Sequence, residues 1–148
     1  AYFEIGKTIN TAPLLLLNIV PGNQTYFIGQ RIFDLLDYYE FVTDEYVSLH
    51  LDHNFNGKLF AKIPALRKLQ WRELVGIRGV VGNISDENIA INASDITYVA
   101  PEKLYWEYHV GVGNIFKLIR IDLVYRGSYK DMPGVTKFAV KGGLGFYF

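Results

Sequence analysis

The sequence predicts an all-β protein, and more specifically the C-terminal strands of an antiparallel transmembrane β-barrel. Several segments alternate between apolar and polar residues with a period of two, which only an extended strand turns into two different faces. These segments are about as long as the ~9–11 residues that cross a bilayer at a tilt. Aromatic residues such as Trp71, Tyr105 and Trp106 lie near their ends, where membrane barrels carry interfacial girdles. We expect about seven to nine strands, with residues 1–148 forming part of one barrel domain.

The first third of the chain has the weakest pattern. Residues 2–9 and 24–32 are compatible with strands, and a Pro-Gly-Asn sequence at 21–23 predicts a turn before the second of them. Residues 31–39 carry apolar side chains at helix-like spacing, which leaves a short helix and a distorted strand as alternatives. The prediction for this region therefore stays open.

The remaining segments are assigned in order along the chain. Residues 46–55 alternate clearly, and residues 71–82 alternate more weakly. Between them, Asn56-Gly57 predicts a tight hairpin, and the proline that begins residues 64–69 suits the first position of one helical turn. The clearest alternation follows in the last third of the chain. Its three predicted strands are residues 105–113, 116–126 and 137–148.

The lengths of the connections predict an orientation. If the last strand ends at the periplasmic side, residues 83–103 and 127–136 are external loops and the turn at 113–114 is periplasmic. Long external loops and short periplasmic turns are the rule for such barrels. Further back, residues 63–70 would be periplasmic and the turn at 56–57 external, which fits the rule less well.

The last two strands carry the residues with the most specific expected roles. A terminal aromatic residue with apolar residues two and four positions before it resembles the signal that barrel-assembly machinery reads. The residues that fit this assembly signal are Leu144, Phe146 and Phe148. The charged residues expected to form a lumen wall are Arg120, Asp122, Arg126, Lys137 and Lys141. Such charges pair across strands in a small or plugged barrel, and set ion preference in an open one.

Composition limits the possible functions. Fifteen Lys and Arg residues balance 15 Asp and Glu residues, so no basic surface predicts nucleic-acid binding. The absence of cysteine excludes disulfides, thiolate zinc sites and cysteine nucleophiles. The longest apolar stretch, residues 13–20, is interrupted by Asn18 and is far shorter than the ~20 residues of a spanning helix. No signal peptide is recognised, which predicts a cleaved leader or an internal fragment, and the strand count favours the fragment.

No catalytic or metal site is expected. Ser48, His50 and Asp52 share one strand face, but same-face neighbours lie ~7 Å apart at Cα, which is awkward for a Ser–His pair. His50 and His53 point to opposite faces and make a poor metal pair. Asp86, Glu87 and Asp95 lack the spacing of a calcium loop. We therefore expect no cofactor and no enzymatic activity.

Several stretches together resemble a known family. They are Pro21-Gly22-Asn23-Gln24-Thr25-Tyr26, Tyr38-Tyr39-Glu40-Phe41-Val42-Thr43-Asp44, His53-Asn54-Phe55-Asn56-Gly57, Lys62-Ile63-Pro64-Ala65-Leu66-Arg67-Lys68-Leu69 with Trp71-Arg72, and Gly113-Asn114-Ile115-Phe116-Lys117. The chain from about residue 21 to its end resembles the C-terminal barrel region of large Bacteroidota outer-membrane proteins. These proteins carry a carboxypeptidase-regulatory-like domain ahead of the barrel and are catalogued mainly as a domain of unknown function. The resemblance implies a much longer complete protein and transfers no catalytic residues.

The leading hypothesis is a structural or transport-type segment of a barrel in the bacterial outer membrane. Its expected partners are outer-membrane lipid and lipopolysaccharide, the barrel-assembly machinery and the missing N-terminal part of the same barrel, with no nucleic acid. Two alternatives stay open. One is a soluble β-sandwich or lipocalin-like binding module, and the other is an outer-membrane barrel enzyme that uses the face of Ser48 and His50.

Overall fold

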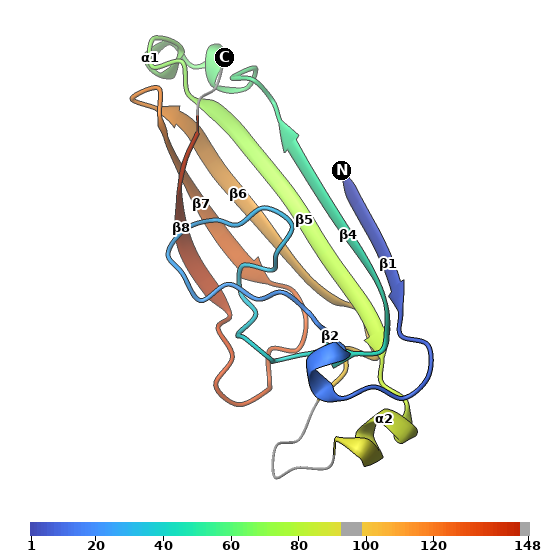
Figure 1. Cartoon of the computed structure of the whole chain (residues 1–148). Helices are drawn as coiled ribbons and strands as arrows, with labels where there is room; N and C mark the ends of the chain where they lie inside the picture. Colours follow the sequence, from blue (N-terminus) through green and yellow to red (C-terminus); the bar gives the residue numbers. More distant parts are fainter. Residues whose placement is uncertain (93–98, 146–148) are drawn as a thin grey trace.

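The computed structural model of the protein describes residues 1–92 and 99–145. Its main element is a six-stranded antiparallel sheet with the strand order β1-β4-β5-β6-β7-β8 (Figure 1). Its strands are β1 (Tyr2–Lys7), β4 (Glu45–Asn54), β5 (Arg72–Asn83), β6 (Tyr105–Ile115), β7 (Ile119–Arg126) and β8 (Phe138–Leu144). A second, two-stranded sheet pairs β2 (Asn18–Ile19) with β3 (Val42–Thr43).

The prediction of an all-β antiparallel fold is confirmed. The central strands β4, β5 and β6 contain 10, 12 and 11 residues, which agrees with the long alternating segments in the sequence. Within the described residues the sheet is open, with β1 and β8 at its two edges, so these strands do not close a complete barrel (Figure 1).

In the described residues, four short helices lie in the connections between strands. They are η1 (Leu14–Leu16), η2 (Phe60–Lys62), α1 (Pro64–Arg67) and α2 (Asp86–Ile91). The predicted helical turn with Pro64 at its first position is therefore confirmed as α1. None of the helices in the described part of the chain has the length and apolar character that a membrane-spanning helix needs.

Residues 20–41 lie across one face of the sheet, and we call them the inner segment (Figure 1). The possible strand at 24–32 is not formed, because this region has only an isolated bridge, between Phe27 and Gly142 of β8. Residues 31–39 form neither a regular helix nor a strand of the sheet. The physical reason is that side chains of the sheet, instead of a neighbouring strand, bind many backbone groups of this segment.

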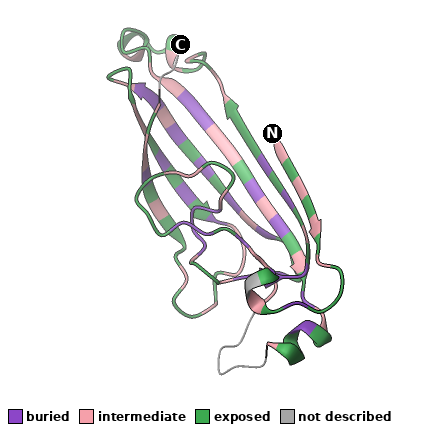
Figure 2. Ribbon diagram, viewed as in Figure 1, coloured by how far each residue is buried: buried purple, intermediate pink, exposed green. Residues whose placement is uncertain are grey.

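The two faces of the sheet differ in polarity and exposure. We call the face under the inner segment the inner face and the opposite one the outer face. Figure 2 shows exposed and buried positions alternating along the strands. The exposed apolar residues of the outer face are Phe3, Ile5, Val47, Leu49, Leu51, Ile77, Val81, Tyr108, Val110, Ile121, Leu123, Tyr125, Phe138 and Val140. The buried polar residues of the inner face are Ser48, His50, Arg78, Glu107, His109, Asp122, Arg126 and Lys141.

An apolar core lies between the inner segment and the sheet. It combines Phe33, Leu36 and Phe41 of the inner segment with Val80 and Tyr105 of the sheet. The expectation that Tyr105 belongs to an outward aromatic girdle is therefore wrong. Tyr105 has the same strand parity as the buried Glu107, so its ring faces the core and meets the ring of Phe33 at 5.5 Å.

The connections gather by length at the two ends of the sheet. Residues 8–44, 84–104 and 127–137 leave one end, and the short turn at 116–118 closes the other. The expected tight hairpin at 56–57 is wrong, because these residues belong to one 17-residue connection, 55–71, that also includes η2 and α1. This connection shares its end with the 116–118 turn, so it is the exception to the predicted separation by length.

One strand boundary and one loop also differ from the expectation. Phe116 and Lys117 have φ angles of +50° and +66° and form the turn before β7, which therefore begins at Ile119. The expected long loop after β5 contains α2, whose first turn includes the exposed Asp86 and Glu87. Asp95, the third acidic residue considered for this loop, lies outside the described residues.

Candidate functional site

Charged side chains form a row across the inner face. Strand pairing places His50 opposite Arg78, Arg78 opposite Glu107, and Glu107 opposite Arg126. The opposite charges of Arg78, Glu107 and Arg126 therefore lie side by side, with His50 next to Arg78, and all four side chains are buried. We call Arg78, Glu107 and Arg126 the charged row, because these three bind the inner segment.

Arg78 of β5 binds the inner segment through three groups. Its Nη1 donates to Oδ2 of Asp34 at 2.5 Å and to the carbonyl oxygen of Ile32 at 2.6 Å, and its Nη2 donates to the carbonyl oxygen of Gly29 at 3.1 Å. The same guanidinium lies 3.7 Å from Oε1 of Glu107. One guanidinium thus lies between two buried carboxylates and fixes a bend of the inner segment.

Glu107 of β6 accepts three hydrogen bonds. The backbone N–H groups of Asp34 and Leu35 donate to its two oxygens at 2.6 and 3.0 Å, and the hydroxyl of Tyr105 donates at 2.9 Å. These three donors offset part of the cost of removing the carboxylate from water. It also occupies N–H groups that would otherwise need a neighbouring strand.

Arg126 of β7 and Lys141 of β8 complete the contacts with the inner segment. Arg126 Nη1 donates to the carbonyl oxygen of Leu35 at 3.2 Å, its Nη2 pairs with Glu40, and its guanidinium lies 4.9 Å from the centre of the Tyr105 ring. Lys141 Nζ donates to the carbonyl oxygen of Asn23 at 3.0 Å and to that of Thr25.

A second charged cluster lies beside the row, closer to the end of the sheet that carries α1. Arg120 forms two hydrogen bonds with Asp122, at 2.5 and 2.8 Å, and its Nη2 lies 3.2 Å from Nε2 of His109. The same ring nitrogen lies 3.2 Å from Oδ1 of Asp52 on β4. This cluster connects β4, β6 and β7 through side chains.

Taken together, the contacts of the charged row and of Lys141 hold the inner segment in place. Asp52 is directed to His109, while His50 packs against the rings of Phe33 at 4.9 Å and Tyr2 at 5.8 Å. In the described part of the chain, no group of three or more His, Cys, Asp or Glu side chains is arranged to hold a metal ion.

The predicted site residues fall into three groups. Arg120, Asp122, Arg126 and Lys141 lie on the inner face as the alternation suggests, whereas Lys137 is exposed just before β8 and outside the charged clusters. Leu144 ends β8 with 72% of its surface exposed. The other two members of the expected assembly signal, Phe146 and Phe148, lie outside the described residues.

The sequence reading missed the partners of these charges. Asp34 and Glu40 of the inner segment bind Arg78 and Arg126 from more than 40 residues away. One signal was available, because Asp34 is a lone acidic residue inside the apolar run 32–36 and is 1% exposed. A charge in such a run needs a buried partner.

Comparison with known proteins gives one match. Residues 17–86 match a family described as "Family of unknown function (DUF5686) C-terminal domain". The matched range includes the inner segment, β3, β4, the 55–71 connection and β5. This supports the expected resemblance to a family of unknown function. No curated protein and no solved structure matches the chain.

Proposed function

We propose that this chain forms part of the wall of an outer-membrane β-barrel whose interior is filled by the inner segment. Its role is structural or transport-type, and it is not a catalyst. The observation that supports the proposal is the reversed polarity of the sheet, with apolar side chains exposed and charged side chains buried. The expected partners are outer-membrane lipid and lipopolysaccharide, and the barrel-assembly machinery.

The outer face is difficult to reconcile with water. Monomeric soluble proteins rarely expose a continuous apolar patch larger than a few hundred Å². Here five strands in a row present exposed apolar side chains, for example Leu49, Ile77, Val110, Leu123 and Val140. In a bilayer the same side chains meet acyl chains, and the polar residues between them face the interior, which is the pattern of membrane barrels.

An aromatic cluster on the outer face supports the same proposal. Trp106 stacks on Tyr108 at 5.9 Å, Tyr108 stacks on Tyr125 at 5.3 Å, and Tyr125 meets Phe138 at 4.8 Å. The cluster crosses three strands near the end that carries the long connections. Amphipathic rings at such a level suit the boundary between acyl chains and headgroups.

The open sheet edges require further strands in a membrane. Unpaired backbone groups of an edge cost several kcal/mol each in hydrocarbon, as an order of magnitude. Tyr26 and Ile28 of the inner segment bind the backbone of Gly142 in β8, and the remaining edge groups of β1 and β8 are proposed to pair with strands of the same, longer barrel. Leu144, Phe146 and Phe148 keep their proposed role as the assembly signal.

The soluble alternative finds less support. A lipocalin-like module needs an apolar cavity inside its sheet, whereas the inner face here is charged and already covered by the inner segment. A β-sandwich needs a second sheet over the outer face. The enzyme alternative needs Ser48 and His50 as a pair, and His50 packs instead against aromatic rings.

A pair of adjacent cysteine variants tests the proposal. The chain has no cysteine, so Val140→Cys on the outer face and Ala139→Cys on the inner face each give one labelling site. With an environment-sensitive fluorophore at each site, lipids brominated along the acyl chain should quench the label at 140 and not the label at 139. Equal quenching, or a chain that stays monomeric in buffer without detergent, would contradict the barrel proposal.

A further inference from the structure

The connection between β4 and β5 is strongly basic, although the whole chain has no net charge. Residues 55–72 contain five cationic and no acidic side chains. The cationic residues are Lys58, Lys62, Arg67, Lys68 and Arg72. Lys117 adds a sixth positive charge from the 116–118 turn at the same end of the sheet. We call this connection together with that turn the basic rim.

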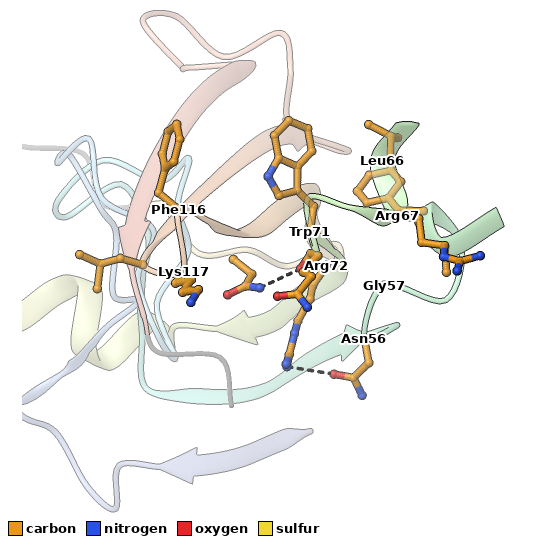
Figure 3. A pocket seen from close by; sticks show the side chains of 13 residues that line it. Asn56, Gly57, Leu66, Arg67, Trp71, Arg72, Phe116 and Lys117 are labelled. Carbon is orange, nitrogen blue, oxygen red and sulfur yellow. Dashed lines mark hydrogen bonds between the residues drawn. The ribbon is translucent and has the colours of Figure 1, made fainter. Parts of the chain in front are cut away.

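The basic rim also exposes large apolar side chains. Leu59, Ile63 and Leu69 are each about half exposed, and Phe116 is 88% exposed. A groove of about 720 Å³ lies between the connection and the 116–118 turn (Figure 3). Its apolar lining includes Phe60, Leu66, Trp71, Phe116 and Leu118. Its cationic lining is Arg67, Arg72 and Lys117.

Hydrogen bonds hold the rim in place. The side-chain amide of Asn114 donates to the carbonyl oxygen of Gln70 at 2.7 Å, which joins the β6 end to the connection. The backbone N–H of Phe55 donates to the carbonyl oxygen of Glu73 at 3.0 Å, and that of Phe60 donates to the Glu73 carboxylate. The groove is therefore a defined surface of the fold.

Most of the rim charges are not neutralised by the protein. Among the described residues, no ion pair involves the exposed Lys58, Lys62, Arg67, Lys68 or Lys117. The Nη1 of Arg72 donates to Oδ1 of Asn56 at 3.3 Å. Five unpaired cations beside exposed apolar and aromatic side chains call for an occupant that is anionic on one side and apolar on the other.

We propose that the basic rim binds the phosphate groups of anionic phospholipid headgroups at the membrane surface. Trp71 lies just before β5 and has the strand parity of Val75 and Ile77, so the groove continues the apolar outer face. Acyl chains on that face bring headgroups to the level of the rim. Cationic side chains near an anionic bilayer surface attract it, and the aromatic rings suit the interface.

This inference rests on the proposed membrane location, and one experiment separates the two. The protein contains two tryptophans, so Trp106→Phe leaves Trp71 in the groove as the only tryptophan reporter. The protein is reconstituted in phosphatidylcholine vesicles that contain an equal mole fraction of either brominated phosphatidylglycerol or brominated phosphatidylcholine. The bromine atoms lie near the headgroup end of one acyl chain. The ratio of the two quenching efficiencies measures the preference for the anionic lipid.

We expect phosphatidylglycerol to be preferred about fivefold at Trp71, because several cations each attract the anionic headgroup. The triple variant Lys62→Gln, Arg67→Gln, Lys68→Gln should lower this ratio to about one. These side chains are exposed, so the fold should be retained. Lys62→Arg with Lys68→Arg should keep the preference, and its loss in that variant would contradict a charge-based contact.

A matched control removes the same charge from the other end of the sheet. Lys103→Gln, Lys130→Gln and Lys137→Gln replace three exposed lysines there and should leave the ratio unchanged. An equal fall in this control would overturn the rim as the binding surface, as would equal quenching by both lipids in the unsubstituted protein. If neither brominated lipid quenches Trp71, the membrane location itself fails.

Discussion

The outer and inner faces of the same strands differ in polarity and in the kind of interaction that their side chains make. On β7, Leu123 is 40% exposed while its neighbours Asp122 and Val124 are almost completely buried. The outer face offers a largely apolar surface, with ring contacts in the aromatic cluster near one end. The inner face contains buried charges whose partners and distances are fixed. The inner face therefore supplies the specific contacts of this fold. The outer face decides whether water or lipid is the more favourable surrounding.

The largest effect is expected when a buried cation is removed from the inner face. Arg78→Ala leaves Asp34 and Glu107 buried without their cation, which is expected to cost about 3–5 kcal/mol. The free energy of unfolding, measured by denaturant titration in detergent micelles, should fall by this amount. The double variant Arg78→Met with Asp34→Leu should recover part of the loss. A change below about 1 kcal/mol in the single variant would show that the charged row does not hold the inner segment.

A charge on the outer face distinguishes lipid from water. Leu123→Lys near the middle of the outer face should cost about 2–4 kcal/mol if the face meets acyl chains. In water the same exposed substitution should change stability by about 0.5 kcal/mol or less. Unfolding in lipid vesicles measures the difference, and Leu123→Phe is the apolar control. A neutral effect of the lysine in vesicles would contradict the membrane contact.

The smallest expected effect concerns the end of the sheet that carries α2. Asp44 Oδ2 accepts hydrogen bonds from the N–H and hydroxyl of Ser85, at 2.8 and 2.6 Å, and from Asn88 at 2.9 Å. Burial alone would raise the pKa of Asp44, but these hydrogen bonds outweigh it and lower the pKa below its ordinary value. Asp44→Asn should therefore cost about 1–2 kcal/mol at neutral pH.

The sign of the pH dependence follows from this lowered pKa. The stabilisation is fully present above the pKa of the unfolded Asp44, about 4, and is lost as the pH falls through the lower folded value. The difference in unfolding free energy between the protein and Asp44→Asn should thus shrink below about pH 4. A difference that does not change with pH would remove the Asp44 carboxylate as the cause.

How much of the fold the sequence predicts depends on the range of the interactions. Residues 105–113 form a strand because their alternation is local, and Pro64 begins a helix for a local reason as well. Asn56 and Gly57 do have the expected turn geometry, with φ angles of +54° and +77°. The hairpin is nevertheless wrong, because this turn lies inside a longer connection and does not join two strands directly. A two-residue turn sequence contains no information about how far along the chain the next strand begins.

The candidate site depends on longer separations. The inner segment looks ambiguous in sequence because its backbone is bound by side chains distant along the chain. The N–H of Asp34 reaches Glu107 across 73 residues, and Arg126 reaches the carbonyl oxygen of Leu35 across 91. Local propensity contains no information about such partners, so neither a helix nor a strand was a sound prediction there.

The sequence by itself determined the long strands of the main sheet and which of their residues share a face, since side chains alternate with a period of two in any extended chain. It also determined that Arg120, Asp122, Arg126 and Lys141 lie on one side of the sheet. Only the tertiary structure decided which side is covered, because the same alternation suits an apolar face turned inward or outward. The inner segment decides it, by burying the charged side under its own backbone and leaving the apolar side exposed.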